Sequence, residues 1–312
     1  MGRPLRLGLI GAGRWGRNYI KTIAALEGVQ LTHLASRNPD SLQLVANDCI
    51  VCADWRAILD PRYLDGVIIA TPPALHAEMA RAAVEAGLPA LVEKPLTLSV
   101  AEAVALRQFV AARGGFVMVG HTHLFHPAFR ALKRLAPRYG TICAIRSEAG
   151  NHGPFRADTP VLWDWGAHDV AMCLDLVGAV PEHVEARRLE SRPVEGALGE
   201  IIKLTLQFPK GLQADIRIGN VMPKRRWLAA HFKTTILVFD DLAPNKLALY
   251  PATANYAAPE GTGKPVEISS ELPLTNVIGD FTAAIRDGNQ DLSTLDLGMS
   301  VVATLARCAP AL

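Results

Sequence analysis

A Gly-x-Gly-x-x-Gly turn follows the first expected strand and opens the first expected helix of this sequence. In such a turn, Gly11 would bend the chain sharply, Gly13 would let the backbone approach a pyrophosphate, and Gly16 would let the helix pack on the strand. Arg14 and Trp15 stand at the helix start, where unpaired N–H groups and the helix dipole favour a diphosphate. The turn therefore predicts a dinucleotide site.

The position that usually binds the adenine ribose carries no carboxylate. An acidic residue about 20 positions after the turn is expected when the cofactor is NAD, because it binds the ribose 2′-hydroxyl. Here Ser36 and Arg37 stand at that position. A hydroxyl beside a guanidinium suits a 2′-phosphate, which predicts NADP. NAD remains the alternative, with Arg37 facing solvent.

Lys94 follows the apolar pair Leu91-Val92, at the carboxyl end of an expected strand, which is where open α/β sheets bind ligands. Pro95 disfavours helix at Lys94. Oxidising a secondary alcohol requires a group that takes the hydroxyl proton, and a nearby cation stabilises the developing alkoxide. Lys94 is therefore a candidate catalytic residue, with a surface lysine as the alternative.

Asp164 and His168 stand four positions apart, so they share one face if a helix begins near Trp163. Histidine suits reversible proton transfer near neutral pH, and Asp164 could orient it or bind a substrate hydroxyl. The alternative is a helix-capping aspartate and a core histidine. Because Lys94 and His168 fall in different expected domains, we expect a site in a cleft between those domains.

Two other clusters carry weaker signals. His121, His123 and His126 could suggest a metal, but a metal site needs further ligands and an open position, so we predict none. Cys49 and Cys52 form a lone C-x-x-C without a second pair, and two packed thiols are the favoured interpretation.

The composition indicates a globular protein with about two domains. The chain has 312 residues, of which 50% are hydrophobic and 20% charged, and its formal net charge is +2. Such a balance gives no electrostatic footprint for nucleic acid. No apolar run reaches the roughly 20 residues of a membrane helix, and no signal-peptide pattern is present. We therefore expect a soluble, cytoplasmic protein.

The pattern of elements divides the chain in two. Residues 1–121 alternate short apolar strands with helices, which predicts a Rossmann domain with a doubly wound parallel sheet. Residues 122–312 carry longer alternating strands, which predict a mostly antiparallel, open-faced sheet with helices on one face. A helical tail from about residue 276 could pack back on the first domain.

Four motifs in order resemble the Gfo/Idh/MocA oxidoreductases. They are the glycine turn, Ala70-Thr71-Pro72-Pro73 with His76, Glu93-Lys94-Pro95, and Trp163-Asp164-Trp165-Gly166-Ala167-His168-Asp169. Val161 to Asp164 and Asp240-Asp241-Leu242 further resemble the branch of nucleotide-sugar 3-dehydrogenases.

The resemblance implies NAD(P)-dependent hydride transfer on sugars, nucleotide-sugars or cyclitols. It implies cofactor contacts at Thr71, Pro72, His76, Glu93, Lys94 and Thr122, and places His123 near the substrate. Asn151 and Arg156 could bind substrate or face solvent. It also implies a homodimer or homotetramer formed through the sheet, whose open face we expect to be apolar.

Two other functions remain open at this point. One is a reductase of a non-sugar carbonyl or imine, because a fold does not determine a substrate. The other is a dinucleotide-sensing regulator without turnover. A sensor needs the glycine turn but no proton shuttle, so Lys94 and His168 favour an enzyme.

Overall fold

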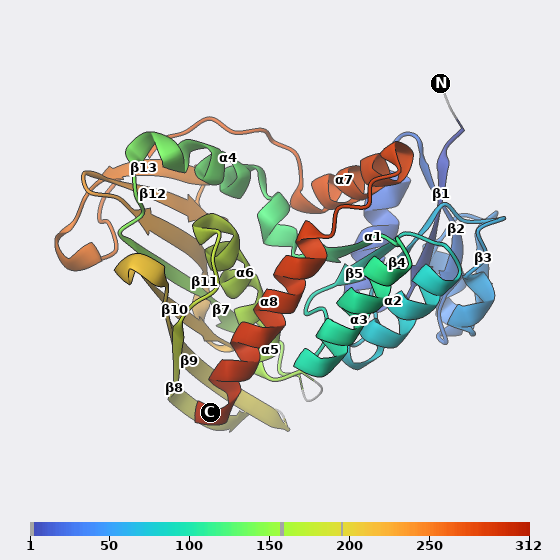
Figure 1. The fold of residues 1–312 in the computed structure, drawn as a ribbon, viewed down its shortest axis with the longest axis horizontal. Coiled ribbons are helices and arrows are strands. Elements are labelled where there is room, and N and C mark those ends of the chain that lie inside the picture. Colours follow the sequence, from blue (N-terminus) through green and yellow to red (C-terminus); the bar gives the residue numbers. More distant parts are fainter. Residues whose placement is uncertain (1–2, 157–158, 195) are drawn as a thin grey trace. The chain divides into compact units, whose positions relative to one another are not determined.

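The chain forms two compact units in the computed structural model, which describes residues 3–156, 159–194 and 196–312 (Figure 1). Unit 1 comprises Met1–Thr122 and Leu272–Val302, and unit 2 comprises His123–Glu271 and Ala303–Leu312. No helix in the described ranges is both long and apolar enough to cross a membrane.

Unit 1 is built on a parallel sheet with the order β3-β2-β1-β4-β5-β6. The strands of this sheet are β1 Leu5–Ile10, β2 Val29–Ala35, β3 Ile50–Cys52, β4 Gly66–Ile69, β5 Ala90–Glu93 and β6 Val117–Gly120. The order reverses direction between β1 and β4, and such a switch point is where doubly wound sheets bind ligands. The predicted Rossmann domain is confirmed.

Apolar faces hold the helices of unit 1 on this sheet. The helices are α1 Arg14–Ala24, α2 His76–Glu85, α3 Val100–Ala112 and α7 Pro273–Asp287. Helix α1 buries Tyr19, Ile20 and Ile23. Helix α3 begins where the Ser99 hydroxyl accepts a hydrogen bond from the Glu102 amide, as expected for a helix cap.

Helix α7 also packs on the parallel sheet. A Cβ added at Gly66 of β4 would meet the side chains of Phe281 and Ile285, so glycine at this position allows helix and strand to approach closely. Helix α8 (Ser293–Cys308) begins in unit 1, where Asp296 pairs with Arg107 of α3 at 2.7 Å, and its last residues belong to unit 2.

Unit 2 is built on a mostly antiparallel sheet with the order β14-β13-β12-β11-β7-β10-β9-β8, in which β7 and β10 run parallel. The strands are β7 Ala144–His152, β8 His183–Val194, β9 Ala197–Gln207, β10 Gln213–Gly219, β11 Val221–His231, β12 Thr235–Asp240, β13 Leu247–Pro251 and β14 Lys264–Pro265. The expected open-faced sheet is confirmed.

The helices of unit 2 pack on one face of its sheet. They are α4 Pro127–Leu135, α5 Val161–Asp164 and α6 Gly166–Val177. Ser147 of β7 contacts Asp169 of α6, and Phe129 of α4 packs edge-on against Phe239 of β12 at 6.5 Å between ring centroids.

The opposite face of this sheet is charged over β7, β9 and β10, where the expected apolar open face is not found, whereas Trp227, Ala229 and Val238 of β11 and β12 lie on that same face. Arg146 and Glu148 of β7 face Asp215 and Arg217 of β10, their direct neighbours in the register. Arg146 pairs with Asp215, and Arg217 lies 3.7 Å from Glu148. Lys203 of β9 adds a second cation 3.1 Å from Asp215. Alternation along each strand turns the apolar residues towards the helices and leaves these charges outside.

Candidate functional site

The glycine turn lies between β1 and α1, and two of its glycines are required by the protein itself. Gly11 has φ +101°, and a Cβ there would lie 2.6 Å from the carbonyl oxygen of Ala70. A Cβ on Gly16 would lie 2.0 Å from the carbonyl oxygen of Gly11. Side chains at either position would displace the backbone at the switch point of the sheet.

Gly13 is different. It caps α1 with φ −67° and ψ −170°, a conformation open to any residue, and a Cβ there would meet no atom within 4 Å. Nothing in the chain's own packing therefore requires glycine at this position. A missing side chain beside the free N–H groups of a helix start leaves room for a diphosphate to approach the backbone, so the residues present fit a dinucleotide.

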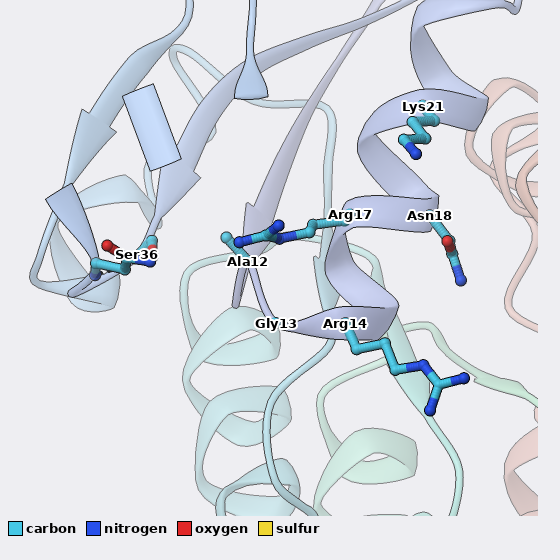
Figure 2. Close-up of a pocket in the computed structure, with 8 residues that line it drawn as sticks. Ala12, Gly13, Arg14, Arg17, Asn18, Lys21 and Ser36 are labelled. Atoms are coloured by element: carbon cyan, nitrogen blue, oxygen red, sulfur yellow. Dashed lines mark hydrogen bonds between the residues drawn. The ribbon is translucent and has the colours of Figure 1, made fainter. Parts of the chain in front are cut away.

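A cavity of about 570 Å³ lies beside this turn, in the size range of roughly 300–1,000 Å³ typical of ligand sites. Figure 2 shows the residues around it, and the Arg17 side chain extends from α1 past Ala12 in the direction of Ser36. The cavity is lined by Ala12, Gly13, Arg14, Arg17, Asn18, Lys21, Ser36 and Asn38.

Only part of this lining is expected from the sequence. Gly13, Arg14 and Ser36 were expected, whereas Arg37 is exposed and does not line the cavity. Arg17 and Lys21 were missed. Their spacing of three and seven positions from Arg14 places all three cations on one face of α1, and that periodicity was the available signal.

The carboxylate of Glu93, at the end of β5, connects the cofactor turn to Lys94. It is buried, and it accepts hydrogen bonds from the indole N–H of Trp15 and, at 2.7 Å, from the hydroxyl of Tyr19. Burial raises the pKa of Glu93, although these donors and Lys94 oppose the shift. The amide of Lys94 donates to the second carboxylate oxygen at 3.2 Å. Glu93 thus holds the start of α1 against the strand end that carries Lys94.

His76 braces the two loops that follow β4 and β5. Its Nδ1 lies 2.9 Å from the carbonyl oxygen of Pro95, and its Nε2 lies 2.8 Å from that of Thr71. Burial lowers the pKa of His76, so the ring is neutral and donates to one carbonyl at a time. The Thr71 hydroxyl lies 3.4 Å from the sulfur of Met79, and Pro72 caps the short turn that precedes α2.

In unit 2, Asp164 and His168 lie on consecutive helical segments. Helix α5 ends at Asp164 and α6 begins at Gly166, with Trp165 between them in helical conformation. A guanidinium nitrogen of Arg156 lies 3.7 Å from a carboxylate oxygen of Asp164. Asn151 lies near the end of β7.

The three histidines of the 121–126 segment have separate surroundings. His123 Nδ1 lies 2.9 Å from Nδ1 of His168, and His126 Nε2 lies 3.2 Å from Asp241. His121 is buried, and neither of its ring nitrogens has a partner among the described residues. Thr122 lies beside it, with its hydroxyl 3.4 Å from the carbonyl oxygen of Gly120.

Neither of the weaker sequence clusters forms a site in the described structure. No group of three histidine, cysteine or acidic side chains is arranged to hold a metal in that part of the chain. Cys49 and Cys52 are both free thiols. Burial raises the pKa of Cys49 to about 11, which keeps that thiol protonated and unreactive.

Comparison with known proteins places the chain in a family. Residues 5–121 match the model described as an oxidoreductase family with an NAD-binding Rossmann fold. A solved structure from Magnetospirillum magnetotacticum MS-1, described provisionally as an oxidoreductase, is 46% identical, with a TM-score of 0.94, and the match covers 98% of this chain and 99% of that one.

Two curated relatives carry named activities. UDP-N-acetylglucosamine 3-dehydrogenase of Acidithiobacillus ferrooxidans is 34% identical over 190 residues, which are 58% of this chain and only 57% of that relative. A solved structure of the same enzyme matches all of this chain and 98% of its own, with 25% identity and a TM-score of 0.84. The 4-carboxy-2-hydroxymuconate-6-semialdehyde dehydrogenase of a Sphingobium species is 26% identical over 93% of each chain. With its glycine turn, its two sheets and these relatives, the chain belongs to the Gfo/Idh/MocA family of oxidoreductases.

Proposed function

We propose that the protein is an NADP-dependent dehydrogenase that transfers a hydride to or from a secondary alcohol or ketone of a nucleotide-sugar or related carbohydrate. The observation that carries the cofactor part is Gly13, whose missing side chain serves no packing need of the chain and stands at the head of a cavity lined by cations. Relatives that act on UDP-N-acetylglucosamine and on inositols support the substrate class.

The preference for NADP rests on Arg17 and Ser36. Both line the cavity beside the glycine turn, with Arg17 directed towards the Ser36 side (Figure 2). A guanidinium and a hydroxyl are donors that a 2′-phosphate accepts, and β2 offers no carboxylate at this position to bind a ribose hydroxyl. Arg37 is exposed and does not line the cavity, so it would contribute positive charge near the site but no lining contact.

The chain's own residues would handle the proton of the reaction. When bound, the nicotinamide accepts or supplies the hydride. Alcohol oxidation also releases a hydroxyl proton, which we assign to His168, while the ammonium of Lys94 stabilises the developing alkoxide. Asp164, paired with Arg156, would bind a substrate hydroxyl. Glu93 would hold Trp15 and the backbone of Lys94 in place.

The test is turnover of a panel that contains UDP-N-acetylglucosamine, inositols and a hydroxymuconate semialdehyde, followed through the absorbance of the reduced nicotinamide. On the substrate that turns over, Lys94→Ala and His168→Ala should each lower kcat by about 10²–10⁴-fold, the usual contribution of general acid–base catalysis. Dissociation constants for the dinucleotide should change less than about twofold.

Each other outcome has a distinct meaning. If only the semialdehyde is turned over, the substrate class is a non-sugar carbonyl and not a carbohydrate. Dinucleotide binding without turnover of any member would favour a sensor. Full activity of both variants would remove Lys94 and His168 from the mechanism.

A further inference from the structure

We infer that His123 is a positioning residue, which accepts a hydrogen bond from Nδ1–H of His168 and so fixes His168 in the tautomer that can take a proton at Nε2. The inference rests on the proposed role of His168 in proton transfer. It concerns a pair of side chains 45 positions apart, both within unit 2.

The contact is made by like atoms, which restricts where the protons can be. The two Nδ1 atoms are 2.9 Å apart, and the rings meet edge to face with 4.3 Å between centroids and 69° between planes. A neutral imidazole carries one N–H and one acceptor nitrogen. A hydrogen bond between two Nδ1 atoms therefore requires one ring to be protonated at Nδ1 and the other at Nε2.

Only one of the two arrangements prepares His168 as a base. If His168 carries its proton on Nδ1, its Nε2 is the acceptor nitrogen, and His123 carries its own proton on Nε2. In alcohol oxidation, the hydride would pass from carbon to the nicotinamide when that is bound, the O–H bond breaks, its proton forms a bond to Nε2 of His168, and the C=O bond forms. The resulting imidazolium still donates its Nδ1–H to His123, and a hydrogen bond from a charged donor is the stronger one. The pair works as a carboxylate–histidine pair does, with a neutral acceptor in place of the carboxylate.

An acidic neighbour favours positive charge on this pair. Asp241 accepts a hydrogen bond from His126 at 3.2 Å and from Arg226 at 3.3 Å. Because the His126 Nδ1 accepts the amide of Ala128 at 3.0 Å, its proton is on Nε2, directed at the carboxylate. Burial opposes ionisation of Asp241, but the hydrogen bond from His126 and the positive charge of Arg226 hold its pKa at about 2. The carboxylate is thus ionised at neutral pH.

Several charged groups around the pair affect any measurement of its titration. Besides Asp241, His126 and Arg226, they include Asp164 and Arg156 on the side of α5, and Asp169 next to His168 on α6. Asp169 turns the other way, towards Ser147 of β7. A direct measurement of the His168 tautomer therefore tests the inference more specifically than a titration of His168 alone.

The experiment uses ¹⁵N-histidine-labelled full-length protein and two variants of His123. His123→Asn keeps an acceptor oxygen near the Nδ1 position, and His123→Phe keeps a ring without an acceptor. In wild type and in His123→Asn, the ¹⁵N shifts of His168 should report a proton on Nδ1, and in His123→Phe the proton should move to Nε2. The His168 signals are assigned by their loss in His168→Ala, and His183→Phe, at an exposed histidine of β8, is the matched control.

Kinetics on the validated substrate provide the second readout. His123→Phe should lower kcat about 10–100-fold with KM nearly unchanged, because it leaves His168 in the tautomer that cannot take a proton at Nε2 and removes the acceptor for the imidazolium Nδ1–H. The acidic limb of the kcat–pH profile of this variant should move down by about 0.5–1 pH unit, because the imidazolium of His168 loses its acceptor. His123→Asn should bring both kcat and the position of the acidic limb most of the way back to the wild-type values. Thermal melting checks that each variant is folded.

The outcomes separate this inference from the proposed function. A wild-type His168 protonated at Nε2, or equal kinetics of the Phe and Asn variants, would overturn the inference while an inactive His168→Ala leaves the proposed function in place. A fully active His168→Ala would overturn the proposed function, whatever the tautomer.

Discussion

Gly13 differs from its two neighbours in the glycine turn because the protein's own packing does not fix its residue type. Gly11 and Gly16 face backbone carbonyl oxygens at distances that no Cβ tolerates, whereas Gly13 faces open space. Within these six positions, glycine is therefore present for two different physical reasons. At residues 11 and 16 the fold itself requires glycine, whereas at residue 13 no contact within the protein does, as we expect if the open space is kept for a bound dinucleotide.

Gly13→Ala should weaken binding of both dinucleotides by about tenfold or more, because the methyl group would occupy the space that a pyrophosphate needs. The free energy of unfolding should fall by less than about 1 kcal/mol, since alanine is only a poorer helix cap than glycine. Calorimetric titration and urea denaturation measure the two effects. Gly279→Ala in α7, where a Cβ also meets nothing within 4 Å, is the matched control, and it should leave binding unchanged. Equal binding by the Gly13 variant and wild type would remove the turn from the cofactor site.

Arg17→Ala should lower affinity for NADPH about tenfold and affinity for NADH less than twofold. A charge-assisted contact contributes about 1.5–3 kcal/mol, and a tenfold change requires about 1.4 kcal/mol. Arg138→Ala, at another exposed arginine, controls for the loss of one positive charge. Adding Ser36→Asp should reverse the preference towards NADH. Tighter binding of NADH than NADPH by wild type would contradict the assignment to NADP.

At the scale of elements, the parallel sheet could be predicted because each strand is a short apolar run that a glycine, proline or polar residue ends. The helical tail expected from about residue 276 begins at Pro273 of α7, and the helix expected to begin near Trp163 forms as two consecutive segments, α5 and α6. The contact between His123 and His168 could not be predicted, because 45 residues separate them and only the packing of α6 decides which side chain each one meets.

The charges on the open face of the sheet in unit 2 follow an alternation that is present in the sequence. Arg146 and Glu148 alternate with the buried residues Ile145, Ser147 and Ala149 along β7, and Asp215 and Arg217 alternate with apolar residues along β10. The sequence alone does not give the register that places Arg146 opposite Asp215 and Glu148 opposite Arg217. Without that register, the sequence predicts four separate solvent-exposed charges and does not predict that they form one connected patch.

Asp169 makes the stability of the α6–β7 contact dependent on pH. Burial raises its pKa to about 7, against the opposing effects of the Ser147 hydrogen bond and of Arg226. Between pH 4 and pH 7, the folded chain keeps a proton on Asp169 that the unfolded chain has lost. The contribution of this group to stability is therefore present at low pH and is lost as pH rises towards 7, with a total on the order of a few kcal/mol.

Asp169→Asn should remove this dependence, because an amide resembles the protonated carboxyl and cannot ionise. Urea denaturation of wild type and variant between pH 4.5 and pH 8 should show the variant gaining stability relative to wild type as pH rises. A difference between the two that stays constant over this range would mean that Asp169 is ionised in the folded protein. Asp175→Asn, at a residue of the same helix whose carboxylate pairs with Lys133 at 2.7 Å, is a suitable control.

At the scale of the whole molecule, the charged sheet face determines what kind of self-association to expect. We expect a homodimer or homotetramer, as the resemblance to the family implies, but with a polar interface if the sheet face of unit 2 forms it. Arg146, Lys203 and Arg217 alternate there with Asp215 and Glu148, so two copies of the face can offer each other opposite charges. Such an interface weakens with salt, since the screening length falls from about 10 Å at 0.1 M to about 3 Å at 1 M ionic strength.

Light scattering at micromolar concentration should show an oligomer at low salt that dissociates as salt rises, and Arg217→Glu should lower the salt concentration at which it does so. A monomer at low salt would exclude the oligomer, and an oligomer that persists unchanged at 1 M salt would place the interface on an apolar surface instead of on these charges.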